Sequence, residues 1–482
     1  MRRPAILKPR EAHKMCGLLP NDSLGLFSGS IDTLACALLE RMYYCKVGDQ
    51  FVEPPPVKSS DVRKHLSPLI AEFTTAIPSF TPVSYDSFVD MYKGPKKEIY
   101  RRAVESLMEV DVCAQDAVAK AFVKREKCNV NKAPRVIQPR NPRYGAALGC
   151  YIKPFEKTLY GALQTLVGRG PVVTKGLNLD GVGMLISEKW HAFTDPVAVG
   201  LDATKFDMHC SKQILQFEHS VYNAIFKDPR LKKLLRMQLV NKGVGFAPDG
   251  KLKYTVEGRR LSGDMNTSCG NCLIMCSLVI VYCRNLNITY DLVNNGDDCV
   301  VFMERCDLIK FQSELVQWFF KFGYRIVCED PVYILEHVEF CQMHPILVDG
   351  NYRMVRNPRV AIEKDTFCVT TLQHGRKYRD WATGVGIGGQ AGCSGIPVLY
   401  SFYSYLNMGG TVHHTLLENT GMSRLQRGMV DQHKGVSDES RYSFYLAFGI
   451  SPDAQIELER WFDTAQFEDK LTIDRYNGYL LI

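Results

Sequence analysis

The sequence predicts an α+β fold, in which helical regions and short antiparallel hairpins are segregated along the chain. Three observations predict this class. Helical spacing of apolar residues dominates residues 61–130, β-type stretches bounded by turn residues cluster between residues 196 and 356, and helical spacing returns after about residue 358. A parallel α/β fold would instead alternate strands and helices regularly along the chain.

The elements of the first half follow from local patterns. The proline-rich segment VEPPPVKSS (Val52–Ser60) indicates a linker or a rigid turn. A short apolar strand ends at Leu201, and a helix is expected from about Ser211, because apolar residues then recur every three or four positions. The next helix should start near Thr267 or Ser268, whose side chains are of the capping type.

The second half contains two predicted hairpins. ITYDLVNNGDDCVVFM predicts a hairpin with its turn at Asn295–Gly296, and a helix that ends before Gly323 follows it. VEFCQM and ILVDGNYRMV predict strands, the latter with an Asp-Gly turn. The glycine-rich segment 384–395 contains a GxGxxG pattern but follows no strand, so it predicts a flexible loop rather than a dinucleotide site.

The composition excludes some classes of protein and favours an acidic partner. The 482 residues, 46% of them hydrophobic, suffice for about three subdomains, and the net charge of +7 favours nucleic acid as a partner. The 17 cysteines and the absence of a signal-peptide pattern predict a reduced, intracellular chain. The lone pair Cys269 and Cys272 lacks the second pair typical of structural zinc, and the apolar run Cys272–Cys283 is too short to span a bilayer.

Acidic residues follow a predicted strand and occupy a predicted turn. Asp202 ends the apolar strand, Asp207 follows with four residues between, and Asp297 and Asp298 are adjacent in the hairpin. If the strand pairs with the hairpin, Asp202 and Asp297 face each other. Such carboxylates repel one another and suit two Mg²⁺ ions, which prefer hard oxygen ligands. A solvated Asn-Gly-Asp-Asp turn without chemical function is the alternative interpretation of the hairpin alone.

A basic segment, residues 120–144, contains eight Lys or Arg residues and one acid, Glu126. Arginine side chains can grip phosphate oxygens with two hydrogen bonds, so the segment could bind a triphosphate. A solvated basic face or a general RNA contact is the alternative interpretation. Its prolines and the pair Val136–Ile137 indicate an ordered, extended element.

Several stretches, in this order and spacing, resemble the motifs of one enzyme family. GLDATKFDMHCS, SGDMNTSCGNCLIM and NNGDDCVVF resemble motifs A, B and C of viral RNA-dependent RNA polymerases, VKREK with APRVIQPR resembles motif F, and VEFCQ resembles motif E. The resemblance is greatest to the tombusvirus family of positive-strand plant viruses, of the carmovirus and umbravirus type, and weaker to the flavivirus family. It covers roughly residues 93–360. One departure is that the motif D region after Gly323 offers no lysine, so its general acid stays unassigned.

The resemblance implies a right-hand polymerase whose small antiparallel palm sheet carries motifs A and C. The implied division is an N-terminal region with fingers at 1–190 (motif F at 120–144), palm at 191–216, a fingers insertion at 217–258, palm at 259–350 and thumb at 351–482.

The resemblance also implies roles for individual residues. Asp202, Asp297 and Asp298 would bind the metal ions and perform catalysis. Ala203 would also bind a metal ion. The ribose and the triphosphate of the NTP would be contacted by Asp207, Ser262, Thr267, Asn271, Lys124, Lys127, Arg135 and Arg140. RNA or the priming nucleotide would be contacted by Gly263, Phe340, Cys341, Gln342, Arg353 and Arg356.

The implied function is replication of a positive-strand RNA genome, starting without a primer. Two Mg²⁺ ions, replaceable by Mn²⁺, would be the cofactors. The partners would be a single-stranded viral RNA template, nascent RNA and NTPs, with a viral auxiliary protein and host factors. The expected location is the host cytoplasm, in membrane-associated complexes reached through partners or an upstream region. Two alternatives stay open: a reverse transcriptase-like polymerase, and a non-catalytic RNA-binding replication component.

Overall fold

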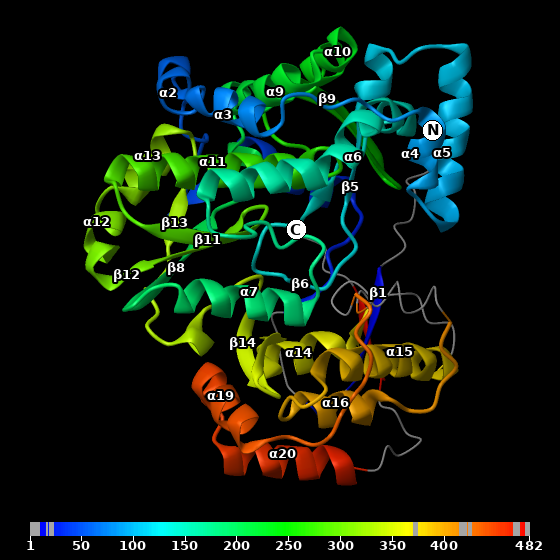
Figure 1. Cartoon of the computed structure of the whole chain (residues 1–482). Helices are drawn as coiled ribbons and strands as arrows, with labels where there is room; N and C mark the ends of the chain where they lie inside the picture. Colours follow the sequence, from blue (N-terminus) through cyan, green and yellow to red (C-terminus); the bar gives the residue numbers. More distant parts are fainter. Residues whose placement is uncertain are drawn as a thin grey trace.

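The structure, a computed structural model, mixes helices with antiparallel strands and confirms the predicted α+β class. Figure 1 shows a large upper part around a central sheet and a smaller helical part below it, formed by the C-terminal region. The structure describes residues 10–15, 18, 24–369, 375–413, 422, 427–465 and 473–477.

The first part of the chain is mainly helical up to Glu109 and then forms strands. The prediction of helices over residues 61–130 is therefore wrong beyond Glu109, where β5 alternates buried and exposed residues with the period of a strand. The proline-rich segment lies between β4 and α2, as expected of a linker. The elements are β1 (Glu11–Met15), β2 (Leu24–Gly25), α1 (Ile31–Leu38), β3 (Cys45–Val47), β4 (Gln50–Val52), α2 (Ser59–His65), α3 (Pro68–Ala76), α4 (Tyr85–Asp90), α5 (Gly94–Glu109), β5 (Ala119–Val123), β6 (Cys128–Asn129), β7 (Val136–Ile137), α6 (Pro142–Val167) and α7 (Leu179–His191).

The middle of the chain contains both predicted hairpins. Helix α9 begins where predicted, and the Ser211 hydroxyl caps it by accepting a hydrogen bond from the N–H of Ile214. The single helix predicted before Gly323 is two helices, divided at Glu314. The elements are β8 (Pro196–Ala203), α8 (Phe206–His209), α9 (Lys212–Phe226), α10 (Pro229–Arg236), β9 (Val240–Ala247), β10 (Gly250–Glu257), α11 (Thr267–Leu286), β11 (Tyr290–Asn295), β12 (Asp298–Glu304), α12 (Leu308–Ser313), α13 (Leu315–Lys321), β13 (Ile326–Cys328), β14 (Met343–Val348) and β15 (Asn351–Arg356).

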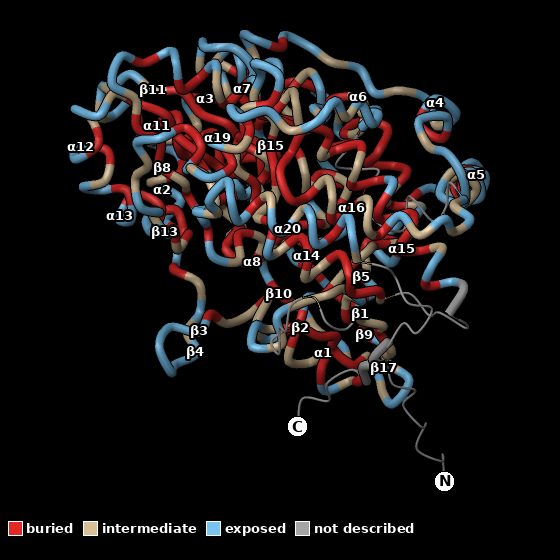
Figure 2. The backbone as a smooth tube through the Cα atoms, turned by 90° about the horizontal axis from the view of Figure 1, so that it is seen from below, coloured by how far each residue is buried: buried red, intermediate tan, exposed pale blue. Residues whose placement is uncertain are grey.

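A four-stranded antiparallel sheet in the order β11-β12-β8-β13 forms the centre of the upper part. Its alternate residues face two different cores. Leu201 and Val301 pack into the core that contains α11, whereas Ala198 and Val300 pack into the core that contains α7. Figure 2 shows buried chain concentrated around β8 and α11, with α5 and α12 at the exposed periphery. The sheet is therefore fixed from both faces by hydrophobic burial.

Helix α11 is the buried helix of the larger core. By length and composition it could cross a membrane, with a mean hydropathy of 1.5, but 83% of that apolar window is buried inside the protein. Cys269, Cys272 and Cys276 lie fully buried along it, which supports the prediction that this CxxC serves helix packing. The apolarity of this helix reflects its central position.

The basic segment is ordered, as expected. Strand β5 pairs with β7 and, in parallel, with β9, giving a second sheet in the order β10-β9-β5-β7. The N–H of Gln138, just after β7, donates to the carbonyl of Ser262 at 2.9 Å. This hydrogen bond attaches the basic segment to the loop that precedes α11.

The hairpin β14–β15 has the predicted Asp-Gly turn. Asp349 and Gly350 both have positive φ, as a two-residue turn of this kind requires. VEFCQM, in contrast, was predicted as a strand and is a tight turn. Phe340 bridges Met343, and Cys341 and Gln342 between them have φ of +54° and +61°.

The C-terminal part corrects the prediction for the glycine-rich segment, which is helical rather than a flexible loop. It forms the second half of α15, and its glycines allow α15 to lie closely against α16. A Cβ on Gly389 would lie 2.1 Å from the Tyr403 ring, and one on Gly386 would lie 2.7 Å from the Asn407 nitrogen. The elements are α14 (Pro358–Asp365), β16 (Phe367–Cys368), α15 (Gly375–Cys393), α16 (Leu399–Leu406), α19 (Asp438–Phe448), α20 (Pro452–Thr464) and β17 (Ile473–Asn477).

We expect Gly389→Ala to lower the free energy of unfolding by about 1–3 kcal/mol, because the added methyl group would force Tyr403 and α16 to move. Gly161→Ala in α6 is the matched control, since nothing lies within 4 Å of its Cβ position, and it should leave stability unchanged or raise it. Chemical denaturation of the two variants measures both values. Equal stabilities would contradict the close approach of α15 and α16.

Candidate functional site

The strands that carry the predicted acids are neighbours in the central sheet. Strand β12 pairs with β8 with Cys299 opposite Leu201, so the same register continued by one residue places Asp298 opposite Asp202. Opposed residues of an antiparallel pair project from the same face. The Asp202 strand does pair with the hairpin, but the residue opposite Asp202 is Asp298, and Asp297, which was expected there, lies in the turn. Asp202, Asp297 and Asp298 are all exposed at this edge.

The turn of the hairpin lies one residue further along than predicted. Asn295 pairs with Asp298, so the two loop residues are Gly296 and Asp297. Gly296 has φ +98°, which glycine adopts at little cost. The buried Asn294 braces the turn: its Oδ1 accepts from the N–H of Gly296, and its Nδ2 donates to the carbonyls of Gly296 and Asp298. The side chain of Asn294 therefore fixes the conformation of the turn that carries Asp297.

The negative charge at this edge is only partly compensated. Desolvation by the surrounding protein raises the pKa of Asp298, and the Asp297 and Asp202 carboxylates raise it further. The expected positive group is Lys175, whose ammonium donates to Asn295 Oδ1 at 2.7 Å and lowers the pKa of Asp298. The pKa of Glu329, which lies over Gly200, is also raised, mainly by desolvation. Sequence reasoning missed Lys175 and Glu329, which lie outside the motifs that carry the site.

Asp207, Ser262 and Asn271 meet as predicted. Ser262 Oγ donates to Asp207 Oδ2 at 3.1 Å, and Asn271 Nδ2 donates to Asp207 Oδ1 at 2.8 Å. Burial raises the pKa of Asp207, the hydrogen bond from Asn271 opposes this, and the charge of Asp297 adds to it. Asp207 therefore links this cluster electrostatically to the acidic turn.

Two other residues of the motif B stretch shape the loop before α11. Thr267 Oγ1 donates to the carbonyl of Leu261 at 2.9 Å, so its hydroxyl fixes the loop. Asn266, rather than Thr267 or Ser268, is the N-cap residue. Gly263 is exposed with φ +130°. Gly263 is therefore accessible in this loop, and its expected contact with RNA stays a prediction.

A small polar cavity of about 110 Å³ lies between the Asp207 cluster and the basic segment. Arg135 reaches it from the basic segment, and Asp207, Ser262 and Asp297 line its other side. Sequence reasoning missed three further basic residues that line it, Arg41, Lys205 and Arg260. Arg41 lies in the helical turn Leu39–Tyr43, far upstream of any motif. A single sequence does not show that this turn lies beside the cavity.

Other basic residues expected at the triphosphate are engaged elsewhere. Lys127 donates to the carbonyl of Lys364 and lies over the Trp381 ring. Arg140 is buried and pairs with Asp264 at 2.5 Å, with further hydrogen bonds to Asn241 and Ala117. Both expectations are corrected: Lys127 attaches the segment to the C-terminal part, and Arg140 fixes the loop before α11.

Lys124 pairs with Glu126 at 2.5 Å, and Arg135 lies 3.5 Å from the same carboxylate. Lys124 is not among the residues that line the 110 Å³ cavity, whereas Arg135 is. Ala203 ends β8 opposite Ile326, so only its backbone carbonyl could reach a cation.

The residues expected at RNA fall into two groups. Cys341 contacts the acidic turn, since its Sγ lies 3.4 Å from Asp298 Oδ2, and Gln342 is exposed beside it. Phe340, however, is buried in the core that contains α7, so its side chain is not available to grip a strand.

The two arginines expected at the initiating nucleotide are structural as placed. Arg353 pairs with Asp180 and donates to the carbonyl of Ser394, and Arg356 pairs with Asp365 and donates to Tyr403. These bonds hold β15 to α7, α14 and α16. Both arginines therefore have packing roles here, and the expected phosphate contacts stay predictions. His413 is exposed, and His414 lies outside the described residues.

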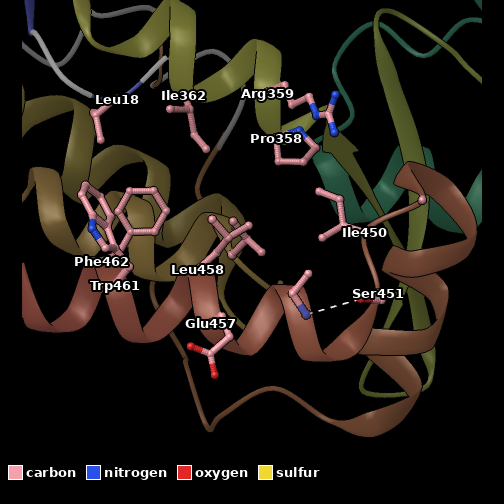
Figure 3. A pocket seen from close by; sticks show the side chains of 13 residues that line it. Leu18, Pro358, Arg359, Ile362, Ile450, Ser451, Glu457, Leu458, Trp461 and Phe462 are labelled. Atoms are coloured by element: carbon pink, nitrogen blue, oxygen red, sulfur yellow. Dashed lines mark hydrogen bonds between the residues drawn. The ribbon is translucent and has the colours of Figure 1, made fainter.

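Two larger cavities differ in whether they lie beside the hairpin that carries Asp297 and Asp298. One of about 860 Å³ adjoins the hairpin and is lined by Asn295 and Cys341 together with four basic residues, Lys153, Lys157, Lys175 and Arg427. The largest, of about 1010 Å³, lies between α14 and α20 and is mostly apolar, with Leu458, Trp461 and Phe462 on one wall (Figure 3). No residue predicted for the site lines the apolar cavity.

The chemistry of the acidic edge suits hard divalent cations. Asp202, Asp297 and Asp298 offer only carboxylate oxygens, which Mg²⁺ prefers, and their mutual repulsion favours a bound cation. Within the described part of the chain, no three His, Cys, Asp or Glu side chains already converge on one point. The donor set therefore fits a divalent ion, and binding would require these side chains to turn toward it.

Comparisons with known proteins agree with the motif arrangement. A family model described as viral RNA-dependent RNA polymerase matches residues 1–470. The chain is 38% identical to the RNA-directed RNA polymerase of Turnip crinkle virus, with 95% of this chain and 60% of that protein covered. The corresponding proteins of Oat chlorotic stunt virus and Tobacco necrosis virus (strain A) are 36% and 39% identical, with 98% and 97% of this chain and 66% of each relative covered. The chain thus spans less than two thirds of these relatives.

We expect Asp298→Asn to raise the thermal unfolding midpoint at pH 7 in EDTA. The raised pKa of Asp298 means that the folded state binds the proton more tightly than the unfolded state, so the ionised carboxylate opposes folding above its folded pKa. The gain should shrink as pH falls through the raised pKa of the folded state and vanish below the ordinary value of 3.8, where both states are protonated. Glu188→Gln, an exposed acid on α7, is the control. A lower midpoint at pH 7 would show that the Asp298 carboxylate supports the turn instead of straining it.

Proposed function

The chain belongs to the viral RNA-dependent RNA polymerase family, and from this premise we propose that it catalyses template-directed RNA synthesis. The observation that carries the proposal is the acidic edge of the central sheet. Asp202 and Asp298 are opposed on β8 and β12, and Asp207 with its Ser262 and Asn271 partners lies beside them. Family membership alone supports the reaction class. The arrangement of these side chains supports the assignment of that reaction to them.

The sheet β11-β12-β8-β13 would serve as the palm of a right-hand polymerase. The N-terminal region with the basic segment, together with residues 217–258, would form the fingers, since β9 of that insertion pairs with β5 of the basic segment. The helices after residue 350 would form the thumb. This division is the one that the family resemblance implies, and the placement of the acids on β8 and β12 supports it.

Asp202, Asp297 and Asp298 would hold two divalent cations, Mg²⁺ or Mn²⁺, with the Ala203 carbonyl as a further oxygen ligand. When bound, these ions would supply the charge that activates a 3′-hydroxyl and stabilises the departing pyrophosphate. The protein's own contribution is the fixed register of β8 and β12 and the braced turn, which keep the carboxylates within reach of one another.

The incoming nucleotide would occupy the 110 Å³ cavity. Asp207 and Ser262 line it and can exchange hydrogen bonds with ribose hydroxyls, because a hydroxyl both donates and accepts. Arg135, Arg41 and Lys205 would neutralise the triphosphate. RNA would pass through the 860 Å³ cavity beside the hairpin, where Lys153, Lys157, Lys175 and Arg427 would contact backbone phosphates.

The wider role would be replication of a plant positive-strand RNA genome, with synthesis started without a primer. The curated relatives named here come from plant viruses, and each is an RNA-directed RNA polymerase. The template would be single-stranded viral RNA. An auxiliary viral protein and host factors would place the enzyme in membrane-associated complexes of the host cytoplasm.

The activity is tested by incubating the purified chain with single-stranded RNA, four NTPs and Mg²⁺ or Mn²⁺. We expect full-length complementary RNA from the wild type and none from Asp297→Ala, with RNA affinity nearly unchanged, because that carboxylate would bind cations rather than RNA. A wild type that binds RNA without making product would favour the non-catalytic alternative. Preferential use of dNTPs would favour the reverse transcriptase alternative.

We expect Arg135→Ala to raise the KM for NTPs by about tenfold or more, because one charge-assisted contact to phosphate contributes about 1.5–3 kcal/mol. Lys132→Ala is the matched control, since Lys132 is exposed on the same segment but does not line the cavity. Steady-state kinetics on a fixed template measure both. An equal KM for the two variants would show that Arg135 does not contact the NTP.

A further inference from the structure

A buried ion pair lies directly behind the Asp207 cluster. Arg260 and Glu218 form it with almost no exposure of either side chain to solvent. Glu218 also accepts hydrogen bonds from Asn266 Nδ2 at 2.8 Å and from the Tyr222 hydroxyl at 2.9 Å. The carboxylate is thus fully engaged, and Arg260 is held in one place between α9 and α11.

Helix α11 is shaped to accept this pair. A Cβ on Gly270 would lie 2.2 Å from Glu218 Oε1 and 2.6 Å from Arg260 Nη2, so the helix has no side chain where the pair contacts it. The next residue along the helix is Asn271. The absence of a side chain at Gly270 therefore brings the guanidinium within reach of the Asn271 amide.

The guanidinium determines which way the Asn271 amide faces. Arg260 Nε lies 3.2 Å from Asn271 Oδ1, and a guanidinium can only donate hydrogen bonds. The amide oxygen must therefore face Arg260, which leaves Nδ2 to donate to Asp207 Oδ1 at 2.8 Å. The flipped amide would set two donors against each other at Arg260 and would place its oxygen against the Asp207 carboxylate.

Arg260 also acts on Asp207 without touching its carboxylate. The backbone N–H of Arg260 donates to the carbonyl of Asp207 at 2.8 Å, which fixes the residue that lines the cavity. The positive charge of Arg260 lowers the pKa of Asp207, against the burial and the Asp297 charge that raise it. The backbone hydrogen bond therefore helps to fix Asp207 as a hydrogen-bond acceptor at the cavity.

We propose that Arg260 is a positioning residue for ribose selection, which sets the amide of Asn271 and through it the acceptor geometry of Asp207. The inference rests on the proposed polymerase function. A ribose 2′-hydroxyl would then meet an Asp207 carboxyl group with one oxygen fixed by Asn271 and the other by Ser262. A nucleotide without the 2′-hydroxyl would leave this buried acceptor partly unsatisfied, which disfavours dNTPs.

The competing explanation is that Arg260 only stabilises the core. Two variants separate the explanations. Arg260→Lys can still pair with Glu218 but has no Nε to hold Asn271. The double variant Glu218→Gln with Arg260→Met removes the guanidinium and leaves no buried charge of the pair uncompensated. Tyr222→Phe is the matched control, because it removes one buried hydrogen bond to Glu218 while the Arg260–Glu218 pair and the Asn271 amide stay in place.

The measurement is the ratio of kcat/KM for an NTP to that for the matching dNTP, with RNA affinity and thermal midpoint recorded for each variant. We expect Arg260→Lys and the double variant to lower the ratio by about tenfold, mainly through a higher KM for the NTP. Tyr222→Phe should keep the wild-type ratio within about twofold, even if its midpoint falls.

Reduced stability with an unchanged ratio in the folded variants would overturn the positioning role and leave Arg260 as a core residue. The double variant retains a folded protein for this comparison should the Lys substitution fail to fold. A wild type that makes no RNA would instead contradict the polymerase function itself, so the two failures are distinct.

Discussion

The repulsion between carboxylates at the edge of the central sheet is the constraint on which the rest of the site depends. The β8–β12 register opposes Asp202 and Asp298, and the turn adds Asp297 beside them. Neighbouring carboxylates of like charge destabilise the folded state unless a cation binds between them. The two hydrophobic cores on either side of the sheet stabilise this arrangement. Their buried apolar side chains fix the strands and so offset the repulsion between the carboxylates at the edge.

The surrounding residues limit this repulsion without removing it. Asn294 braces the turn through three backbone hydrogen bonds, and Lys175 supplies a nearby positive charge. Behind them, the buried Arg260 fixes Asn271 and so Asp207. On the proposed function, the exposed carboxylates would bind cations, and a nucleotide would lie between Asp207 and the basic segment.

Local patterns in the sequence predicted the fold class, helix α9, the hairpin and its pairing with the Asp202 strand, because periodicity and turn residues act over a few positions. They misplaced the turn by one residue, since the Asn294 amide braces it from inside. They also assigned a loop to α15, whose glycines serve close helix packing. The meeting of Asp207, Ser262 and Asn271 was predicted through family resemblance. The sequence did not predict the protein partners of Arg140 and Arg353, because Asp264 and Asp180 lie far away from them in sequence.

Counting bound cations tests the two-ion site most directly. Electron paramagnetic resonance of Mn²⁺ can measure the free ion during titration of the protein with template RNA and a non-reactive NTP analogue. We expect two Mn²⁺ ions per wild-type chain, and weak or no binding to Asp202→Asn and Asp297→Asn. Identical Mn²⁺ binding by the wild type and both variants would contradict a catalytic cation site at the junction of β8 and β12.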